Sequence, residues 1–586
     1  MTSERGSIRW LWAALAATFL AYAGALAYPF VYDDMAVILN NPRITSWHYF
    51  PSYFTSHVWA HIPVGLQANY YRPTFMAWML LTQTFAGLEP WAWHFSTLLL
   101  HLATTYLVFR LALRLMFTVP ISAMAALFFG LHPVHIESVA WVCGSTDPIM
   151  AIFLVLFFMA YLDFVEAEKF SWSALLRMDL FLLIALWSKE TAIVMPAICA
   201  AHAWLLVDRT RLTRTKAIAW VLHSGTITLV YLLLRVHALG GLSNTMQQAS
   251  WNVVLMSAPG VLWDYLRTLL LPFPLSLFYA TTYVHSVRAP EFWQPLLGIL
   301  FLAFVFWCLV HNATATKKRW AWFGCLAIFV PLALPIYTIA FFGDGDIVHD
   351  RYTYVSSIAF CILLAEGVNR LSERFTEFHR PEVAGLPTEH TRWFGLSVPT
   401  AVLAILIATM YFIGTSYQKQ QWSSNGLLYS HAIAVSRTSA LAYVQMGEEF
   451  NAQGDNASAV NMYEHAFQVN PNSYLASFML ANERRNAGRL PESEQLLRHA
   501  IALDDRNPTV EYRLAQVEML QNHVQDAEST LRAAIARWPD APALHYALGI
   551  ILKSQGKLPE AKAAFQREQQ ISPNDSSSRN ELKAME

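Results

Sequence analysis

Apolar runs follow one another through the first 416 residues, whereas the rest of the chain mixes charged residues with alanine. A run of roughly 17–25 mostly apolar residues can cross a bilayer as a helix. The pattern predicts an all-α fold, in which a polytopic membrane bundle of about eleven spans precedes a soluble helical part. The expected spans are 10–30, 93–112, 115–131, 148–164, 175–187, 191–207, 217–235, 292–311, 320–342, 352–368 and 394–416.

The stretch between residues 236 and 291 leaves the number of spans open. Residues 253–272 fit a crossing helix, or a re-entrant helix that returns at Pro272 and Pro274. Lys and Arg concentrate in cytoplasmic loops, so their clusters must fall on one side. The stretch therefore holds no crossing or two, and thirteen spans is the alternative. The clusters lie at 5–9, 110–114, 169–177, 209–216, 317–319 and 370–392.

The same clusters predict the orientation in the membrane. With all of them inside, the N-terminus is cytoplasmic and the soluble C-terminal part is on the opposite side. That side is the periplasm for a bacterial inner membrane, or the lumen of the endoplasmic reticulum in a eukaryote. We expect the first run to be kept as a signal anchor, because no A-x-A cleavage site follows it.

The C-terminal part repeats with a period of 34 residues, the length of a tetratricopeptide (TPR) unit. Four units start near residues 440, 474, 508 and 542, and the eighth position of each is small: Gly447, Ala481, Ala515 and Gly549. We expect a membrane domain over 1–417, a linker helix over 418–439 and a TPR solenoid over 440–586. Such solenoids have a concave face that suits an extended polypeptide or a partner protein.

Composition narrows the function classes. The chain is 55% hydrophobic and 14% charged, with a net charge of −1, so nothing indicates a nucleic-acid partner. Its five cysteines show neither a disulfide framework nor a metal-ligand spacing. We expect membrane lipid to surround the first domain, and no metal or other cofactor.

Ionisable side chains gather at the predicted outer ends of the spans. Asp33 and Asp34 come directly after the first span, where a carboxylate is costly to desolvate and often marks a functional site. Lys189 and Glu190 fit the same site, or a structural ion pair with each other. The other members of this group are Arg72, His132, His135, Glu137, Asp147, Asp344, Asp346, His349, Asp350 and Arg351.

Several motifs, in order, resemble those of the GT-C class of membrane glycosyltransferases. The likeness is greater to the transmembrane and TPR-repeat-containing (TMTC) protein O-mannosyltransferases and their prokaryotic relatives. One departure is Gly144 to Asp147, where the family usually has a basic residue before the acid, which puts the role of Asp147 in doubt. The motifs are Y-D-D (32–34), N-N-P (40–42), Y-R-P (71–73), L-L-L-H (98–101), L-H-P-V-H-I-E-S-V-A-W-V (131–142), S-K-E (188–190), D-R-Y (350–352) and the repeats.

The resemblance implies a polyprenyl-phosphate sugar as donor, with mannose as the expected sugar. The implied acceptor is a Ser or Thr hydroxyl of an exported protein, and inversion at the anomeric carbon is expected. A hydroxyl attacks only if its proton is removed, and a carboxylate can act as the general base. We expect Asp33 and Asp34 to be catalytic, and the residues alone do not decide which one is the base. Donor-phosphate binding is expected of Arg72, Lys189, His349 and Arg351, and substrate binding of His132, His135, Glu137, Glu190 and Asp350.

Two other functions fit the sequence. A GT-C transferase could act on a lipid or a cell-envelope glycan instead of a protein. The chain could also be a non-catalytic, membrane-anchored TPR adaptor whose outer charges are structural.

Overall fold

The computed structural model describes residues 2–62, 69–241, 249–279, 281, 283–341, 347–378, 392–393, 396–504, 506–573 and 575–585. These residues are largely helical, apart from an antiparallel pair of two-residue strands, β1 (Arg392–Trp393) and β2 (Leu396–Ser397). The chain divides into two compact units, Met1–Val58 with Asn69–His431 and Trp59–Ala68 with Ala432–Glu586. The predicted fold class, an all-α chain with a membrane part and a repeat array, is confirmed.

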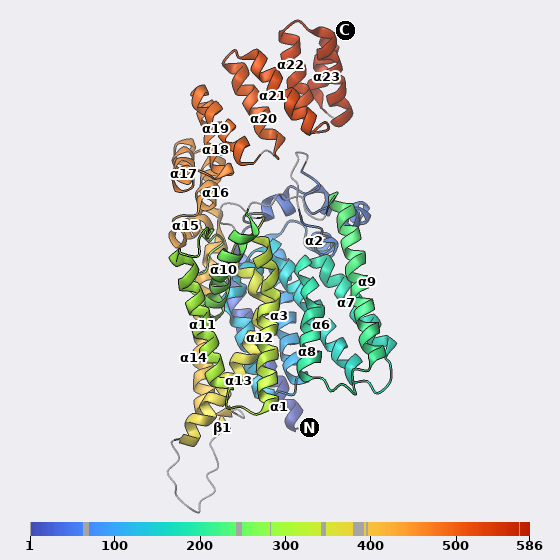
Figure 1. Cartoon of the computed structure of the whole chain (residues 1–586), viewed down its shortest axis with the longest axis vertical. Helices are drawn as coiled ribbons and strands as arrows, with labels where there is room; N and C mark the ends of the chain where they lie inside the picture. Colours follow the sequence, from blue (N-terminus) through green and yellow to red (C-terminus); the bar gives the residue numbers. More distant parts are fainter. Residues whose placement is uncertain are drawn as a thin grey trace, which may run out of the picture. The chain divides into compact units, whose positions relative to one another are not determined.

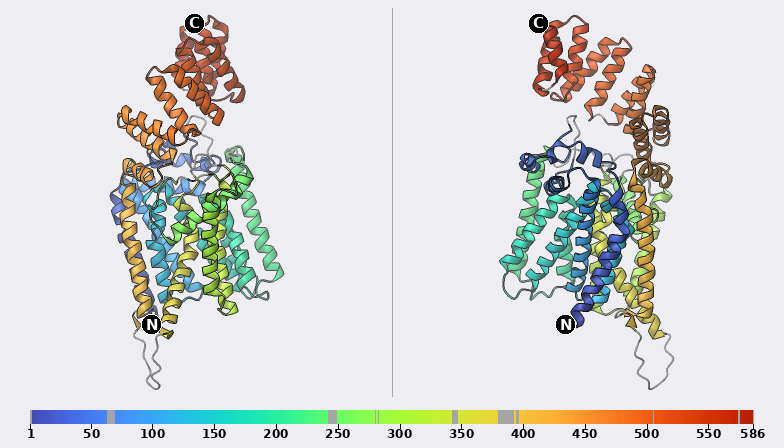
Figure 2. Two further views of the ribbon diagram at one scale, coloured as in Figure 1. Left: turned by 60° about the vertical axis from the view of Figure 1, so that its left-hand side comes forward. Right: turned by 180° about the vertical axis from the view of Figure 1, so that it is seen from behind.

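The first unit is a bundle of long helices that lie side by side (Figure 1). Seen from behind in Figure 2, the first and last helices of the bundle run next to each other. The helices are α1 (Thr2–Tyr22), α2 (Pro73–Ala86), α3 (Pro90–Arg114), α4 (Val119–Leu131), α5 (Ile136–Ala140), α6 (Thr146–Glu166), α7 (Trp172–Ser188), α8 (Met195–Leu206), α9 (Arg214–Leu239), α10 (Trp251–Leu270), α11 (Pro290–Val310), α12 (Ala315–Thr338), α13 (Tyr354–Phe378) and α14 (Val398–Gln418).

Short helical turns connect these helices, and most of the site described below lies on them. α15 (Asn425–Val435) follows the last turn and continues into the second unit. The turns are η1 (Ala23–Ala27), η2 (Met35–Leu39), η3 (Pro42–Ile44), η4 (Trp47–Phe54), η5 (Pro133–His135), η6 (Val142–Ser145), η7 (Glu190–Val194), η8 (Asp350–Thr353) and η9 (Lys419–Ser423).

In the described part of the chain, nine helices are long and apolar enough to cross a membrane. Eight overlap predicted spans, and the ninth is α10. Three predicted spans are shorter: α4 has 13 residues, α7 has 17, and the third is Glu190–Leu206. α4 ends early because Pro133 interrupts it, and the chain bends there by 51°. Counting the bent pair as one span gives ten.

Both ends of α10 contact the same end of the bundle. At its start, the Ala249 N–H donates to the Ala340 carbonyl, 3.2 Å away, just beyond α12. Near its end, the Leu269 carbonyl lies 3.0 Å from the His132 ring, just beyond α4. η8 contacts both α12 and the turn after α4, so these two ends adjoin. This arrangement fits the re-entrant alternative, which needs no crossing between residues 236 and 291.

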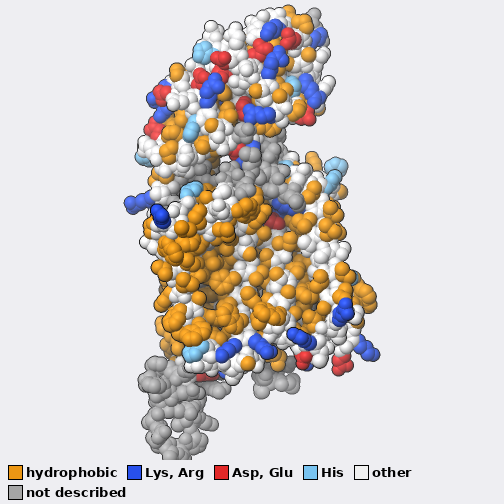
Figure 3. Space-filling view, in the orientation of Figure 1, with side chains coloured by type: hydrophobic (Ala, Val, Ile, Leu, Met, Phe, Trp, Pro, Cys, Tyr) orange, Lys and Arg blue, Asp and Glu red, His pale blue; other side chains and the backbone are white. Residues whose placement is uncertain are grey.

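Burial separates the core of the bundle from its lipid-facing surface. The span that contains α6 is 72% buried, whereas no residue of α11 is buried. Hydrophobic side chains cover the visible face of the unit, and Lys and Arg line the end where the N-terminus lies (Figure 3). An apolar surface of this extent is expected of a membrane protein.

The second unit stacks helix pairs, as the period of 34 predicts. Small eighth positions allow the two helices of a pair to approach: a Cβ at Gly447 would lie 2.5 Å from the Tyr463 ring, and one at Gly549 would lie 2.5 Å from Phe565. The helices are α16 (Ala440–Ala452), α17 (Asn456–Val469), α18 (Tyr474–Asn486), α19 (Leu490–Leu503), α20 (Pro508–Leu520), α21 (Val524–Arg537), α22 (Leu544–Ser554), α23 (Leu558–Ile571) and α24 (Ser576–Ala584). Residues Asp505 and Asn574 of this array lie outside the described residues.

Candidate active site

The acidic loop, residues 31–34, follows α1 and η1 and is held in a conformation that most residues avoid. Tyr32 has a φ of 54°, in the left-handed region that non-glycine residues rarely adopt. Asp34 follows, fully buried, and accepts a hydrogen bond of 2.9 Å from the Cys143 N–H of η6. Burial raises the pKa of the Asp34 carboxyl to about 7, although the Cys143 hydrogen bonds oppose the rise. Asp34 therefore ties the acidic loop to η6.

Asp33 is the more accessible carboxylate of the pair. It is only partly buried, and its carbonyl accepts hydrogen bonds from the Ala36 and Val37 N–H groups at the start of η2. Burial raises the pKa of the Asp33 carboxyl to about 6, and the positive charge of Arg351 limits the rise. A carboxylate with a pKa near neutrality is suited to accept a proton.

Arg351 joins η8 to the L-H-P-V-H-I-E segment. Its guanidinium forms an ion pair with Glu137 of α5, and its backbone N–H donates to the same carboxylate at 3.0 Å. The guanidinium also lies over two aromatic rings, 5.5 Å from the centroid of Trp141 and 5.3 Å from that of Tyr352. Cation–π contacts of this kind are typical of Arg.

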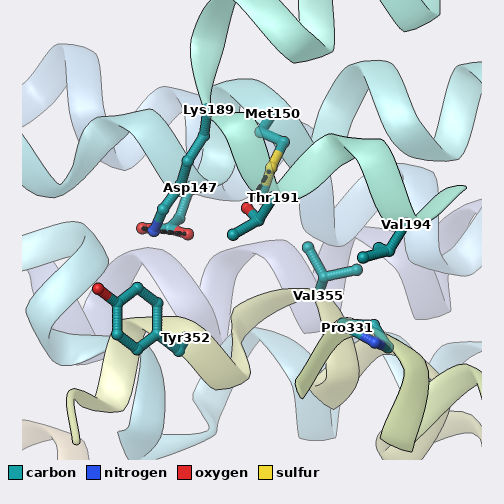
Figure 4. Close-up of a pocket in the computed structure, with 8 residues that line it drawn as sticks. All are labelled: Asp147, Met150, Lys189, Thr191, Val194, Pro331, Tyr352 and Val355. Atoms are coloured by element: carbon teal, nitrogen blue, oxygen red, sulfur yellow. Dashed lines mark hydrogen bonds and ion pairs between the residues drawn. The ribbon is translucent and has the colours of Figure 1, made fainter. Parts of the chain in front are cut away.

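Lys189 and Asp147 form a buried ion pair. The ammonium donates to both carboxylate oxygens of Asp147, at 2.7 and 2.8 Å, and lies 5.0 Å from the centre of the Tyr352 ring. Burial lowers the pKa of Lys189, and the Asp147 charge opposes this. Figure 4 shows the pair beside a pocket whose far wall includes Pro331 and Val355. The structure thus gives Asp147 a basic partner in Lys189, although no basic residue directly precedes Asp147 in the sequence.

Arg72 and Glu190 form a second pair in two-point contact. One Arg72 nitrogen donates at 2.9 Å to one Glu190 oxygen and the Nε donates at 3.3 Å to the other. The Arg72 guanidinium also lies 4.5 Å from the centre of the Tyr70 ring. Lys189 and Glu190 are therefore not each other's partners, so the simple structural pair considered for them from sequence is wrong.

A chain of contacts links these groups across four of the segments that connect the helices. The Tyr32 ring packs on Trp141 at 5.6 Å, Trp141 lies against Arg351, Arg351 lies against Tyr352, and Tyr352 lies against Lys189. The charges of Arg351 and Arg72 both lower the pKa of Lys189, so the two arginines lie within electrostatic reach of it. The structure thus brings together Asp33, Asp34, Arg72, Glu137, Lys189, Glu190 and Arg351.

The predicted histidines face protein groups. His132 and His135 are fully buried, and a ring nitrogen of each contacts the Leu269 carbonyl (3.0 Å) and the Ser357 hydroxyl (2.8 Å), respectively. His349 is buried 3.9 Å from Glu137. These contacts indicate that the histidines stabilise the bend after α4 and its surroundings. A sugar or phosphate contact at these residues stays a prediction.

Asp350 is also buried, and it accepts a hydrogen bond of 2.7 Å from the Tyr279 hydroxyl. The two other acids of this loop, Asp344 and Asp346, lie outside the described residues. Asp350 therefore joins η8 to the loop after α10, and its predicted contact with substrate is untested.

Sequence reasoning missed the aromatic residues that connect the ionic groups. Tyr70, Trp141, Tyr279 and Tyr352 contact Arg72, Arg351, Asp350 and Lys189. Trp141 and Tyr352 sit within the motifs 131–142 and D-R-Y, and Tyr70 lies two residues before Arg72, which was the available signal. Among the residues that the structure describes, no three His, Cys, Asp or Glu side chains are grouped to hold a metal ion.

The C-terminal repeats match a family model described as "Tetratricopeptide repeat" over residues 444–508 and 512–576. The human "Protein O-mannosyl-transferase TMTC3" is 22% identical over 461 residues, covering 73% of this chain and 47% of the relative. The human "Protein O-mannosyl-transferase TMTC4" is 23% identical over 498 residues, covering 74% and 62%. A solved structure titled "Crystal structure of MamA" is 16% identical and aligns with a TM-score of 0.24 over 28% of this chain and 90% of that one.

The chain spans about half the length of the first of these relatives. The likeness extends over about three quarters of this chain and so includes part of the membrane unit. With its long apolar helices, its TPR repeats and this likeness in sequence, the chain resembles the TMTC protein O-mannosyltransferases.

Proposed function

We propose that this membrane protein transfers a sugar, mannose in the first instance, from a polyprenyl phosphate to Ser or Thr hydroxyls of proteins. The observation that carries the proposal is Asp33, a partly accessible carboxylate with a pKa raised to about 6, beside Arg351 in a cluster of ion pairs. The resemblance to proteins named as O-mannosyltransferases supports the reaction class.

In this reaction Asp33 acts as the general base. The acceptor oxygen forms a bond to the anomeric carbon while its proton passes to Asp33, and the bond from the anomeric carbon to the phosphate oxygen breaks. Attack on the face opposite the phosphate inverts the anomeric carbon. Such base assistance contributes about 10²–10⁴-fold to a rate.

Cations must receive the charge of the departing lipid phosphate. Arg72 and Arg351 suit this role, because their side chains are 14% and 16% exposed, against 3% for Lys189. An arginine in two-point contact with a carboxylate keeps further N–H donors for a phosphate. We therefore assign phosphate contact to the two arginines, and to Lys189 the role of joining α6, α7 and η8. No metal takes part in this proposal.

The remaining parts of the proposal concern orientation and acceptor. The Lys and Arg at the end of the bundle where the N-terminus lies support a cytoplasmic N-terminus and a site on the opposite side of the membrane (Figure 3). The TPR groove would hold an extended segment of the acceptor protein.

The test uses the purified full chain in lipid nanodiscs with mannosyl phosphates of undecaprenol and dolichol. Ser- or Thr-containing polypeptides serve as acceptors, and matched polypeptides with Ala at those positions are the control. Peptide mapping by mass spectrometry is expected to find one hexose on a Ser or Thr. Transfer to lipid or glycan acceptors alone would favour the envelope-modifying alternative, and absence of transfer to any acceptor would favour the adaptor.

A further inference from the structure

The segment 418–431, which joins the last span to the repeats, packs against the acidic loop. At its start, the buried Lys419 ammonium donates to the Ala21 carbonyl at 2.6 Å, near the end of α1. A Cβ at Gly24 would lie 3.1 Å from the Lys419 side chain, so the lysine fits closely against η1. The segment therefore fixes the point where the chain leaves the first span.

The same segment also holds the loop that follows α10. The Gln418 amide accepts from the Leu275 N–H at 2.8 Å and donates to the Pro272 carbonyl at 2.9 Å. The His431 ring contacts the Leu275 carbonyl at 2.9 Å. This loop carries Phe278, whose ring lies 6.0 Å from that of Tyr32. The segment thus contacts η1, which precedes the acidic loop, and the loop after α10, which packs on Tyr32.

Two residues of the segment contact Trp141 and Tyr32, which belong to the candidate site. Trp422 is buried and stacks on Trp141, with ring centroids 6.1 Å apart and an interplanar angle of 20°. Trp141 in turn contacts both Tyr32 and Arg351. Asn425, at the start of α15, accepts a hydrogen bond of 2.9 Å from the Tyr32 N–H through its side-chain oxygen.

The hydrogen bond from the Tyr32 N–H to Asn425 stabilises an unusual backbone conformation at Tyr32. A non-glycine residue with a φ of 54° persists only where its surroundings enforce it. Asn425 accepts from that very residue, and Asp33 is the next residue along. Loss of this acceptor would let Tyr32 relax to a more common conformation, and the relaxation would move the Asp33 carboxylate.

We propose that Asn425 and Trp422 are positioning residues that hold Asp33 and Arg351 in the positions that catalysis requires. The proposal rests on the function proposed above, in which Asp33 is the base. Neither residue touches the reacting atoms; Asn425 acts through Tyr32 and Trp422 acts through Trp141. The segment after the last span is thus part of the active-site structure as well as a connection.

The test compares Asn425→Leu, which removes the acceptor at similar volume, with Asn425→Asp, which keeps an oxygen acceptor. Gln420→Leu is the matched control, because Gln420 is exposed in the same segment. Hydrogen–deuterium exchange of the full chain in nanodiscs is followed over residues 31–39. We expect faster exchange in Asn425→Leu, beginning at Tyr32, and near wild-type exchange in Asn425→Asp and Gln420→Leu.

Turnover supplies the second measurement. We expect kcat of Asn425→Leu to fall by about 10²-fold with KM for the donor little changed, since small misplacements of a catalytic group have effects of this size. Trp422→Leu is expected to do the same and Trp422→Phe to retain most activity, which covers the case where Asn425→Leu does not fold.

Unchanged exchange over residues 31–39 in both Asn425→Leu and Trp422→Leu would overturn the proposal. So would unchanged kcat in the presence of faster exchange. A wild-type chain that transfers no sugar would instead contradict the proposed function, and the exchange data would still decide whether the segment holds the acidic loop.

Discussion

Replacing Asp34 by Asn should make the protein less sensitive to alkaline pH. Asp34 is fully buried, and its pKa is raised from 3.8 to about 7, mainly by desolvation. Because the folded-state value is the higher one, this group's contribution to stability is complete below about pH 4 and is lost as the pH rises through 7. The amide oxygen of the Asp34→Asn variant can still accept from the Cys143 N–H.

The two pKa values set the size of the effect. A shift of about three units corresponds to a total loss of about 4 kcal/mol of stability once the pH is above 7, and about 2–3 kcal/mol of this is lost between pH 5 and pH 8. The wild-type chain should therefore lose that amount over this range, in addition to a smaller loss from Asp33. The Asp34→Asn variant should lose only the part due to Asp33 and any other titrating groups.

Thermal unfolding of the two proteins in the same detergent, at pH 5 and pH 8, measures the difference. Glu89→Gln is the control, since Glu89 is exposed in the same unit. We expect Tm to fall more steeply with pH in the wild type and in the control than in Asp34→Asn. Equal slopes in all three proteins would refute the account of Asp34 as a buried carboxyl that resists ionisation.

Two further changes test the packing. Gly447→Ala should lower the free energy of unfolding of the repeats by about 1–3 kcal/mol, because the new Cβ would meet the Tyr463 ring at 2.5 Å. Chemical denaturation measures the change, and a Gly447→Ala variant as stable as the wild type would contradict the packing argument. Lys189→Met should cost about 3–5 kcal/mol by leaving Asp147 buried and unpaired. The double variant Lys189→Met/Asp147→Leu should recover much of this in thermal unfolding, and a double variant as unstable as the single one would contradict the pairing.

The repeats could be predicted from sequence nearly residue by residue because each unit repeats one local packing rule. Position eight is glycine where position twenty-four is aromatic, as in Gly447 with Tyr463, and alanine where it is leucine, as in Ala481 with Leu497. A departure also has a physical reason. Glu568, where the pattern has a small residue, is buried and accepts from the Ala543 and Tyr546 N–H groups at the start of α22.

Long spans were predictable for a similar reason, since hydropathy reports length directly. α10 shows the limit of prediction from hydropathy. It is long and apolar enough to cross a membrane, yet both its ends contact one end of the bundle. Whether an apolar helix crosses depends on the contacts of its ends, which lie far away in sequence. Hydropathy alone does not contain that information.

Which residues belong to the site could be predicted in part, and their pairing could not. Sequence placed Lys189 beside Glu190, whereas the fold pairs Lys189 with Asp147 and Glu190 with Arg72. The extended backbone at Lys189, between α7 and η7, turns the two neighbours in different directions. Charge type and spacing identify candidates, but partner choice follows from how the helices pack.

The central claim is that Asp33 removes the acceptor proton at a site that also holds Arg351, and the most direct test is single-turnover sugar transfer by Asp33→Asn. The account predicts a rate at least about 10²-fold below that of the wild type, with donor binding retained. The wild-type rate should also rise with pH through about 6, where Asp33 loses its proton. Transfer by Asp33→Asn at the wild-type rate would contradict the account.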